Sequence, residues 1–362
     1  MRWSAFVHRC FSGVMHDGIL AQVAPMTVRI WTFRVVLMVA AVTGCSQPSD
    51  QGYVSRQGNI MGSYYSITAR CIDNPEASID MAVAALERVD RQMSSWKEDS
   101  NLMRLNQLPV NETMAVPSEL WDILTLSEEV RKASHGAFDV SVGALVKAWG
   151  FGSGTAGPAP TEQTIQALLP SRETAGYRLI APDLAGRNRE DVFIDVSAIA
   201  PGYAVDLAAD VMNETGCPDV MVDVSGEVRT RGKGPKGNGW RIGIESPELL
   251  HGGLEGVLVL KDRAVSTSGD YRNFRDLNGQ RISHSIDPRT GRPIMHGLAS
   301  VTVVHDTAAL ADAWSTALNV LGPTEGMALA KLNNLPVYML VRDSDRFEAV
   351  YTDPMKTLMD LP

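Results

Sequence analysis

The feature that most constrains the fold is a change of hydrophobic periodicity near Asp219. Before this residue, apolar side chains recur at helical spacing, most clearly over residues 79–93 and 120–130. After it, apolar and polar residues alternate in short runs separated by turn residues, a pattern typical of strands. The expected strands are residues 220–224, 240–244, 257–260, 301–304, 337–341 and 347–351. Strands grouped in this way predict an α+β fold with a largely antiparallel sheet and packed helices, rather than a doubly wound parallel sheet.

Other elements follow from local signals. Asn74 and Pro75 predict a helix start, with an N-cap followed by proline in the first turn. The residues 198–212 and 310–321 have helical patterns, and the apolar run 192–196 predicts a short strand. The run 192–196 therefore leads directly into a helix, and such a junction presents free backbone N–H groups to an anion.

Residues 1–44 differ from the rest of the chain. The apolar run 35–42 follows Arg29 and Arg34 and is too short to span a bilayer. It ends at small residues directly before Cys45. A charged region, a short apolar region and small residues in this order indicate an export signal.

A cysteine in this position resembles the lipidated cysteine of a bacterial lipobox. We therefore expect lipidation at Cys45 and anchoring to a bacterial membrane, facing the periplasm. Met26 stands just before the pattern, and we expect translation to start there. On this interpretation, residues 45–57 are a tether and residues 58–362 form one domain. The alternative is a buried or anchoring helix with an incidental cysteine.

Composition narrows the choice of function. The chain has 33 basic and 42 acidic residues, which argues against a nucleic-acid partner. Export would permit a disulfide between Cys71 and Cys217, but two cysteines do not determine a pairing. Two separate buried thiols are the expected arrangement.

The common catalytic motifs are missing from the sequence. No glycine-rich dinucleotide fingerprint follows the first strands, and the sequence has no P-loop, no paired zinc-binding histidines and no serine nucleophile elbow. Several small polar motifs remain, at residues 134–139, 194–206, 266–271, 284–293 and 312–316. Each has a structural explanation when taken alone.

The motif at 312–316 is the most informative of these. Asp312 and Thr316 stand four residues apart on an expected helix, so their oxygens share one helix face. Asp312 could equally complement the helix dipole. In the other motifs, Asp287 could form only a turn, His284 could be structural, and Phe138 could belong to the core.

Taken in order, these motifs resemble one family, the ApbE-type FAD:protein FMN transferases, also called flavin transferases. The resembling blocks are residues 61–63, 94–96, 99–100, 136–139, 149–152, 195–206, 222–227, 268–271, 284–293 and 312–316. The resemblance implies an α+β fold sometimes called T-fold-like, with FAD bound in a cleft. It also implies transfer of FMN from FAD to a Thr or Ser hydroxyl of a target flavoprotein, with release of AMP. Respiratory flavoproteins, such as subunits of sodium-pumping quinone reductases, are the implied acceptors.

The resemblance also assigns roles to individual residues. It implies a Mg²⁺ ion held by Asp312, Thr316 and the backbone carbonyl of Ala198. His284 and Asp270 are the candidates for activating or placing the acceptor hydroxyl. The residues implied to contact FAD are Met61, Trp96, Ala137, Phe138, Asp139, Asp195, Pro201 and Ile286.

Two departures from the family pattern stand out. Position 201 is proline where the family often has a polar or charged residue. The turn at residues 225–227 reads Ser-Gly-Glu where the family usually has two glycines and Asn or Asp, and serine adopts a positive φ poorly. Two other functions remain open: an FAD pyrophosphatase that uses water as the acceptor, and a non-catalytic FAD-binding lipoprotein.

Overall fold

The chain divides into two units, residues Met1–Gln47 and Pro48–Pro362. The computed structural model describes residues 52–152, 157–247, 253–269, 274–277, 280–343 and 346–360, all within the second unit. The expectations for residues 1–44, Met26 and Cys45, and for most of the tether, lie outside the described residues. So does Asp270.

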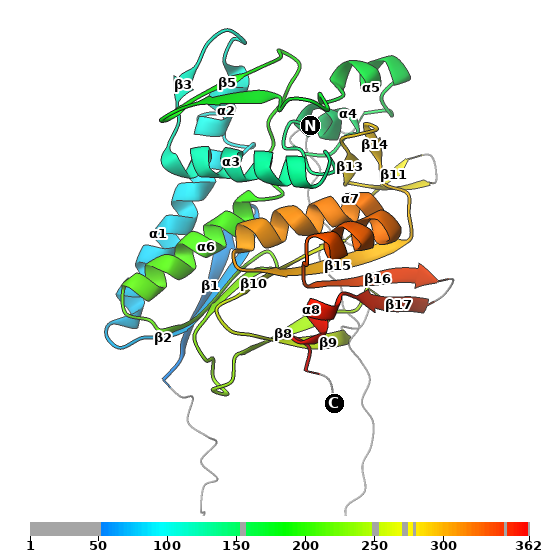
Figure 1. Cartoon of the computed structure of the whole chain (residues 1–362). Coiled ribbons are helices and arrows are strands. Elements are labelled where there is room, and N and C mark those ends of the chain that lie inside the picture. The colour runs from blue at the N-terminus through cyan, green and yellow to red at the C-terminus, as the bar shows by residue number, and fades with distance from the viewer. Residues whose placement is uncertain are drawn as a thin grey trace, which may run out of the picture. The chain divides into compact units, whose positions relative to one another are not determined.

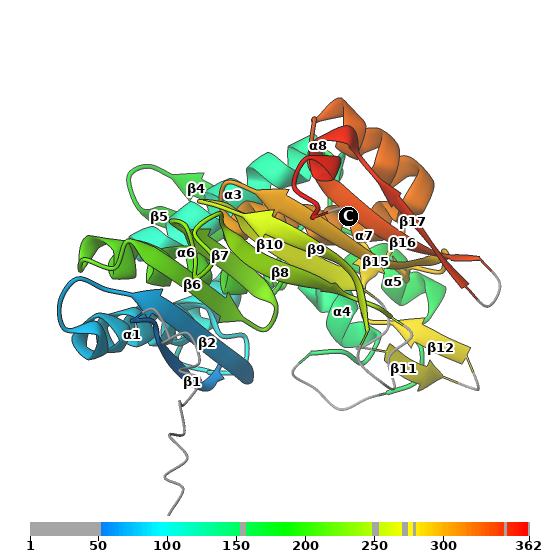
Figure 2. The same cartoon turned by 90° about the horizontal axis from the view of Figure 1, so that it is seen from below.

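One large sheet organises the second unit. Its eight strands lie in the order β1-β2-β6-β7-β10-β15-β16-β17, and all neighbours are antiparallel (Figures 1 and 2). The predicted α+β class with a largely antiparallel sheet is therefore confirmed. The strands are β1 (Val54–Ile60), β2 (Ser63–Arg70), β6 (Asp219–Val224), β7 (Glu227–Arg231), β10 (Ala264–Gly269), β15 (Leu298–His305), β16 (Val337–Asp343) and β17 (Arg346–Tyr351).

Smaller sheets surround this one. A three-stranded sheet has the order β3-β5-β4, and three further pairs are antiparallel hairpins. Their strands are β3 (Met114–Ala115), β4 (Tyr177–Ile180), β5 (Leu184–Arg187), β8 (Trp240–Glu245), β9 (Leu254–Leu260), β11 (Phe274–Leu277), β12 (Gln280–Ser283), β13 (Ile286–Asp287) and β14 (Arg292–Pro293).

Helices pack mainly on one face of the large sheet, where α1, α6 and α7 form a layer (Figure 1). Among the described helices, none is long and apolar enough to cross a bilayer. The helices are α1 (Pro75–Met93), α2 (Asn101–Gln107), α3 (Ser118–Ala133), α4 (Gly143–Ala148), α5 (Glu162–Leu168), α6 (Ala200–Glu214), α7 (Ala308–Leu332) and α8 (Asp353–Lys356). The predicted start of α1 is confirmed, since the Asn74 side chain accepts a hydrogen bond from the Ala77 N–H at 3.4 Å.

Both faces of the sheet are buried along its central strands. Along β16, Val337 and Met339 belong to the main core under the helices, whereas Tyr338 and Leu340 belong to a second cluster. Because side chains alternate across a strand, these pairs lie on opposite faces. The second cluster is covered by the β8–β9 hairpin and by Met355 of α8.

The helices α6 and α7 cross in close contact. A Cβ atom at Gly202 would overlap with the carbonyl of Ala308, so only glycine fits this crossing without a shift. The carboxylate of Asp206 accepts hydrogen bonds from the N–H groups of Ala308 at 2.8 Å and Ala309 at 2.9 Å. Asp206 thereby satisfies the free donors at the start of α7 and ties that end to α6. The helix expected at 310–321 is the first part of α7, which is kinked at Gly322, where the φ is 75°.

The predicted strand at residues 192–196 is wrong. Only Phe193 forms an isolated bridge, to Val142. The backbone of Ile194 is instead bonded by the Asn106 side chain, which accepts from the Ile194 N–H at 2.7 Å and donates to its carbonyl at 2.9 Å. A side-chain amide thus replaces the neighbouring strand that an apolar run normally finds.

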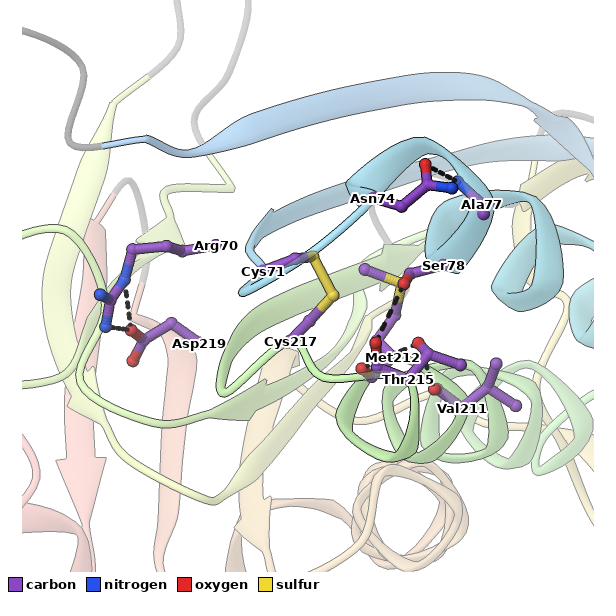
Figure 3. The surroundings of a disulfide bond; sticks show 10 residues. All are labelled: Arg70, Cys71, Asn74, Ala77, Ser78, Val211, Met212, Thr215, Cys217 and Asp219. Atoms are coloured by element: carbon purple, nitrogen blue, oxygen red, sulfur yellow. Dashed lines mark hydrogen bonds and ion pairs between the residues drawn. A yellow bond between two sulfur atoms is a disulfide. The ribbon is translucent and has the colours of Figure 1, made fainter.

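The expectation of two separate thiols at Cys71 and Cys217 is also wrong, because the two residues form a disulfide (Figure 3). Cys71 follows β2 and Cys217 precedes β6, and these strands are neighbours with Arg70 opposite Asp219. The Arg70 Nε donates to the Asp219 carboxylate at 2.8 Å beside the bridge. The strand register therefore brings together two cysteines that are 146 residues apart in the chain.

Candidate functional site

A cavity of about 550 Å³ lies where the β6–β7 turn, the start of α6 and the first part of α7 meet. Ten of the residues implied by the family resemblance line it, although they come from four separate stretches of the chain. They are Ala137, Phe138, Asp139, Asp195, Ala198, Pro201, His284, Ile286, Asp312 and Thr316. The fold therefore brings the main sequence motifs to one place.

Two of the implied residues do not line this cavity. Met61 lies in the β1–β2 turn with a φ of 51° and packs against the main core. Trp96 follows α1, and 69% of its surface is exposed. Asp270 lies outside the described residues, but its neighbours Ser268 and Gly269 line the cavity.

One wall carries the two acids Asp139 and Asp195. Asp139 is buried, and its carboxylate accepts a hydrogen bond from the Ser141 N–H at 2.8 Å. Burial raises the pKa of Asp139, and the bonds from Ser141 oppose this shift. The Asp195 N–H donates to the Val140 carbonyl at 2.7 Å, so the two acidic segments are joined by their backbones.

Asp312 also lines the cavity, and this residue is only 5% exposed. Its carboxylate accepts a hydrogen bond from the Gly202 N–H at 3.3 Å. Burial raises the pKa of Asp312 well above its usual range, and the nearby Glu227 carboxylate raises it further. Burial together with Asp223 likewise raises the pKa of Glu227 to about 7. A buried acid beside a second, half-buried acid is costly unless a cation or shared protons offset their charge.

Glu227 is the functional candidate that sequence reasoning missed. The turn at residues 225–227 is visible in the sequence as a departure from the family pattern, but nothing there places the Glu227 carboxyl beside Asp312. In the structure, Ser225 adopts a φ of 59° and Gly226 a φ of 107°. The turn therefore keeps the left-handed backbone that two glycines would favour, and it aims β7 and Glu227 into the cavity.

A group of hydroxyls lies between β10 and α7. The Ser268 Oγ is 2.8 Å from the Ser315 Oγ and 3.3 Å from the Thr316 Oγ1. Asp312 and Thr316 lie one turn apart on α7 and both line the cavity, as their spacing predicts. Ala198 lines it from the turn before α6.

These residues fit a magnesium ion chemically. The Asp312 carboxylate, the Thr316 hydroxyl and the Ala198 carbonyl are hard oxygen donors of the kind that Mg²⁺ prefers. The carboxylates that line the cavity are Asp139, Asp195, Asp223, Glu227, Glu245 and Asp312. Among the described lining residues there is no Lys or Arg. A cation held by these oxygens would balance part of the charge of a pyrophosphate bound here.

His284 lies on a segment fixed from two sides. The neighbouring Ser285 Oγ accepts a hydrogen bond from the Asn319 side chain of α7 at 3.2 Å, and β13 pairs with β14 directly afterwards. The His284 ring lies edge-on to Phe151, with 6.5 Å between the ring centres. His284 thus faces the cavity from the side of the small hairpins.

Comparison with known proteins places this chain in a family. Residues 61–339 match the ApbE family. The FAD:protein FMN transferase of Klebsiella pneumoniae (strain 342) is 35% identical over 343 residues, covering 90% of this chain and 97% of that protein. The Escherichia coli (strain K12) FAD:protein FMN transferase is 33% identical, with 90% and 97% covered.

Solved structures agree with this assignment. The apo form of Pseudomonas stutzeri flavinyl transferase ApbE has a TM-score of 0.78 and 32% identity, covering 86% of this chain and 98% of that one. The Vibrio cholerae flavin transferase ApbE has a TM-score of 0.76 and 34% identity, covering 84% and 99%. The chain therefore belongs to the ApbE family.

Proposed function

We propose that this protein is a Mg²⁺-dependent FAD:protein FMN transferase that moves FMN from FAD to a Ser or Thr hydroxyl of an acceptor flavoprotein and releases AMP. The observation that carries the proposal is the pairing of the buried Asp312 with Thr316 in an acid-lined cavity. A protein that only binds FAD needs no such site for a cation at the pyrophosphate. Membership of the ApbE family supports the same reaction.

The reaction forms one bond and breaks one. The acceptor oxygen bonds to the phosphorus on the FMN side of FAD, and the bond from that phosphorus to the bridging oxygen breaks. AMP leaves with the electron pair, and the hydroxyl proton passes to AMP or solvent. A Mg²⁺ ion on Asp312, Thr316 and the Ala198 carbonyl would neutralise charge on the pyrophosphate. Asp139 and Asp195 would accept hydrogen bonds from the nucleotide, and Phe138 and Ile286 would supply apolar walls.

The transfer assay uses purified protein, FAD, Mg²⁺ and the soluble flavin-bearing domain of a sodium-pumping quinone reductase subunit prepared without FMN. We expect a covalent FMN adduct on this domain by mass spectrometry and one AMP per adduct. Free FMN and AMP without an adduct would indicate the pyrophosphatase alternative. Bound but unchanged FAD would indicate a binding protein.

Magnesium binding should depend on pH. The pKa of Glu227 is raised to about 7 and that of Asp312 well above its usual range, so protons compete with the cation at low pH, and Glu227 loses its proton as the pH rises through about 7. The stability of the metal-free protein should therefore fall as the pH rises, and the stabilisation by Mg²⁺ should grow. Melting temperatures with and without Mg²⁺ between pH 5.5 and 8.5 measure this. Glu227→Gln is the control variant, and in it both the stability without Mg²⁺ and the stabilisation by Mg²⁺ should depend less on pH. An equal Mg²⁺-induced shift at every pH would contradict the prediction.

We further propose that the protein is exported and anchored by lipid at Cys45, facing the periplasm. The signal-like segment before Cys45 supports this, and so does the Cys71–Cys217 disulfide, because disulfides persist in oxidising compartments. Cys45→Ala should leave the precursor unprocessed and the protein without lipid. Intact mass and membrane fractionation of both forms measure the change. Mature unmodified protein that starts at another residue would refute the anchor.

A further inference from the structure

The large sheet opens at the cavity. Strand β10 pairs with β7 only at Ala264 and Val265, because β7 begins at Glu227 and the chain turns away there. Strand β10 continues to Gly269 and stays paired with β15 along its whole length. Beyond Val265, the side of β10 that faced β7 therefore has no strand partner among the described residues.

The hydrogen bonds of β10 and β15 to their other neighbours show which backbone groups face this open side. The Arg263 carbonyl accepts from the Thr230 N–H of β7 at 2.8 Å, so Arg263 faces β7. Backbone groups alternate along a strand, and thus Thr267 and Gly269 face the same side. On β15, the Val304 N–H donates to the Pro336 carbonyl, on the side of β15 away from β10. The backbone groups of Val301 and Val303 therefore face β10, where they lie opposite Ser268 and Ser266. The bonds to β7 and the bonds to β15 thus both place the backbone N–H and C=O groups of Thr267 and Gly269 on the open side of β10.

This open edge adjoins the reacting centre. Ser268, between the two outward-facing residues, has its Oγ 3.3 Å from the Thr316 Oγ1. Thr267, Ser268 and Gly269 all line the cavity. A strand added to this edge would place its side chains about 5 Å from those of β10. A residue opposite Ser268 would thus present its side chain beside Thr316 and Asp312.

We propose that an extended segment of the acceptor protein pairs with the free edge of β10 at Thr267 and Gly269, and so delivers its Ser or Thr hydroxyl to the phosphorus. This inference rests on the proposed function. Backbone pairing supplies affinity through main-chain hydrogen bonds, whatever the side chains of the paired segment. Asp223 and Glu227 line the same cavity as this edge, so the segment should be neutral or basic rather than acidic.

The test compares Gly269→Pro with Gly269→Ala in the full-length protein. Proline removes the outward N–H of Gly269 and leaves the β10–β15 bonds in place, whereas alanine keeps the N–H. With the quinone reductase domain as acceptor, Gly269→Pro should lower transfer about tenfold relative to FAD hydrolysis in the same sample, through the KM for the acceptor. Gly269→Ala keeps this N–H and should therefore lower transfer less than Gly269→Pro does.

The possible negative results distinguish the strand-edge inference from the proposed function. Equal transfer by Gly269→Pro, or a rise in the KM for FAD instead of the acceptor, would overturn the strand-edge inference and leave the proposed function standing. A lack of transfer by the unsubstituted protein would overturn both.

A proline scan of the acceptor segment tests the same edge with the enzyme unchanged. Strand pairing predicts loss of transfer at alternate positions, because only every second acceptor N–H faces β10. A loss without this alternation would also overturn the inference.

Discussion

Asp312→Asn is expected to abolish FMN transfer and FAD hydrolysis together, by about 1,000-fold or more, while the protein stays folded. Asparagine keeps the shape of the buried side chain but removes the charge that would hold a cation. Folding should not suffer, because the substitution removes a buried acid beside Glu227 and so relieves the repulsion between the two side chains. Transfer rate, AMP release and the melting temperature without Mg²⁺ measure the three effects.

Thr316→Val is the graded control for this result. It deletes a neutral oxygen from the same helix face at nearly constant volume, so activity should fall in the same direction by about ten- to a hundredfold. EDTA should reproduce the loss in the unsubstituted protein, and added Mg²⁺ should reverse it. A folded Asp312→Asn protein with the original rate and the original Mg²⁺ dependence would show that the metal is held elsewhere.

Loss of the Cys71–Cys217 bridge should lower the free energy of unfolding by about 3–5 kcal/mol. The bridge joins residues 146 positions apart, so its removal frees a long loop in the unfolded chain. Urea unfolding with and without reductant measures the loss, and the Cys71→Ser, Cys217→Ser double variant should match the reduced protein. Reductant should not change the double variant. Equal stability of the oxidised and reduced forms would contradict the prediction.

The sequence predicted the elements that have strong local signals. The N-cap at Asn74, the alternating strands after Asp219 and the helix that carries Asp312 and Thr316 each depend on neighbours within a few residues. The family resemblance supplied the rest of the candidate site, and the fold brings most of those residues to one cavity.

Features that depend on strand register could not be predicted in the same way. The bridge between Cys71 and Cys217 needs β2 beside β6 in one alignment, and the approach of Glu227 to Asp312 needs the end of β7 to face α7. The run 192–196 has the composition of a strand, but Asn106 satisfies its backbone instead. Each outcome is set by a partner far away in the chain.

The glycine at the crossing of α6 and α7 has a consequence for engineering and evolution of the acceptor range. Gly202 both permits the crossing and donates its N–H to Asp312, so the spacing of the two helices and the placement of that carboxylate cannot vary separately. Libraries that aim to redirect flavinylation to new targets should leave this crossing unchanged. Diversity is better placed along β10 and the β6–β7 turn, where a new substrate can be accommodated without displacing Asp312.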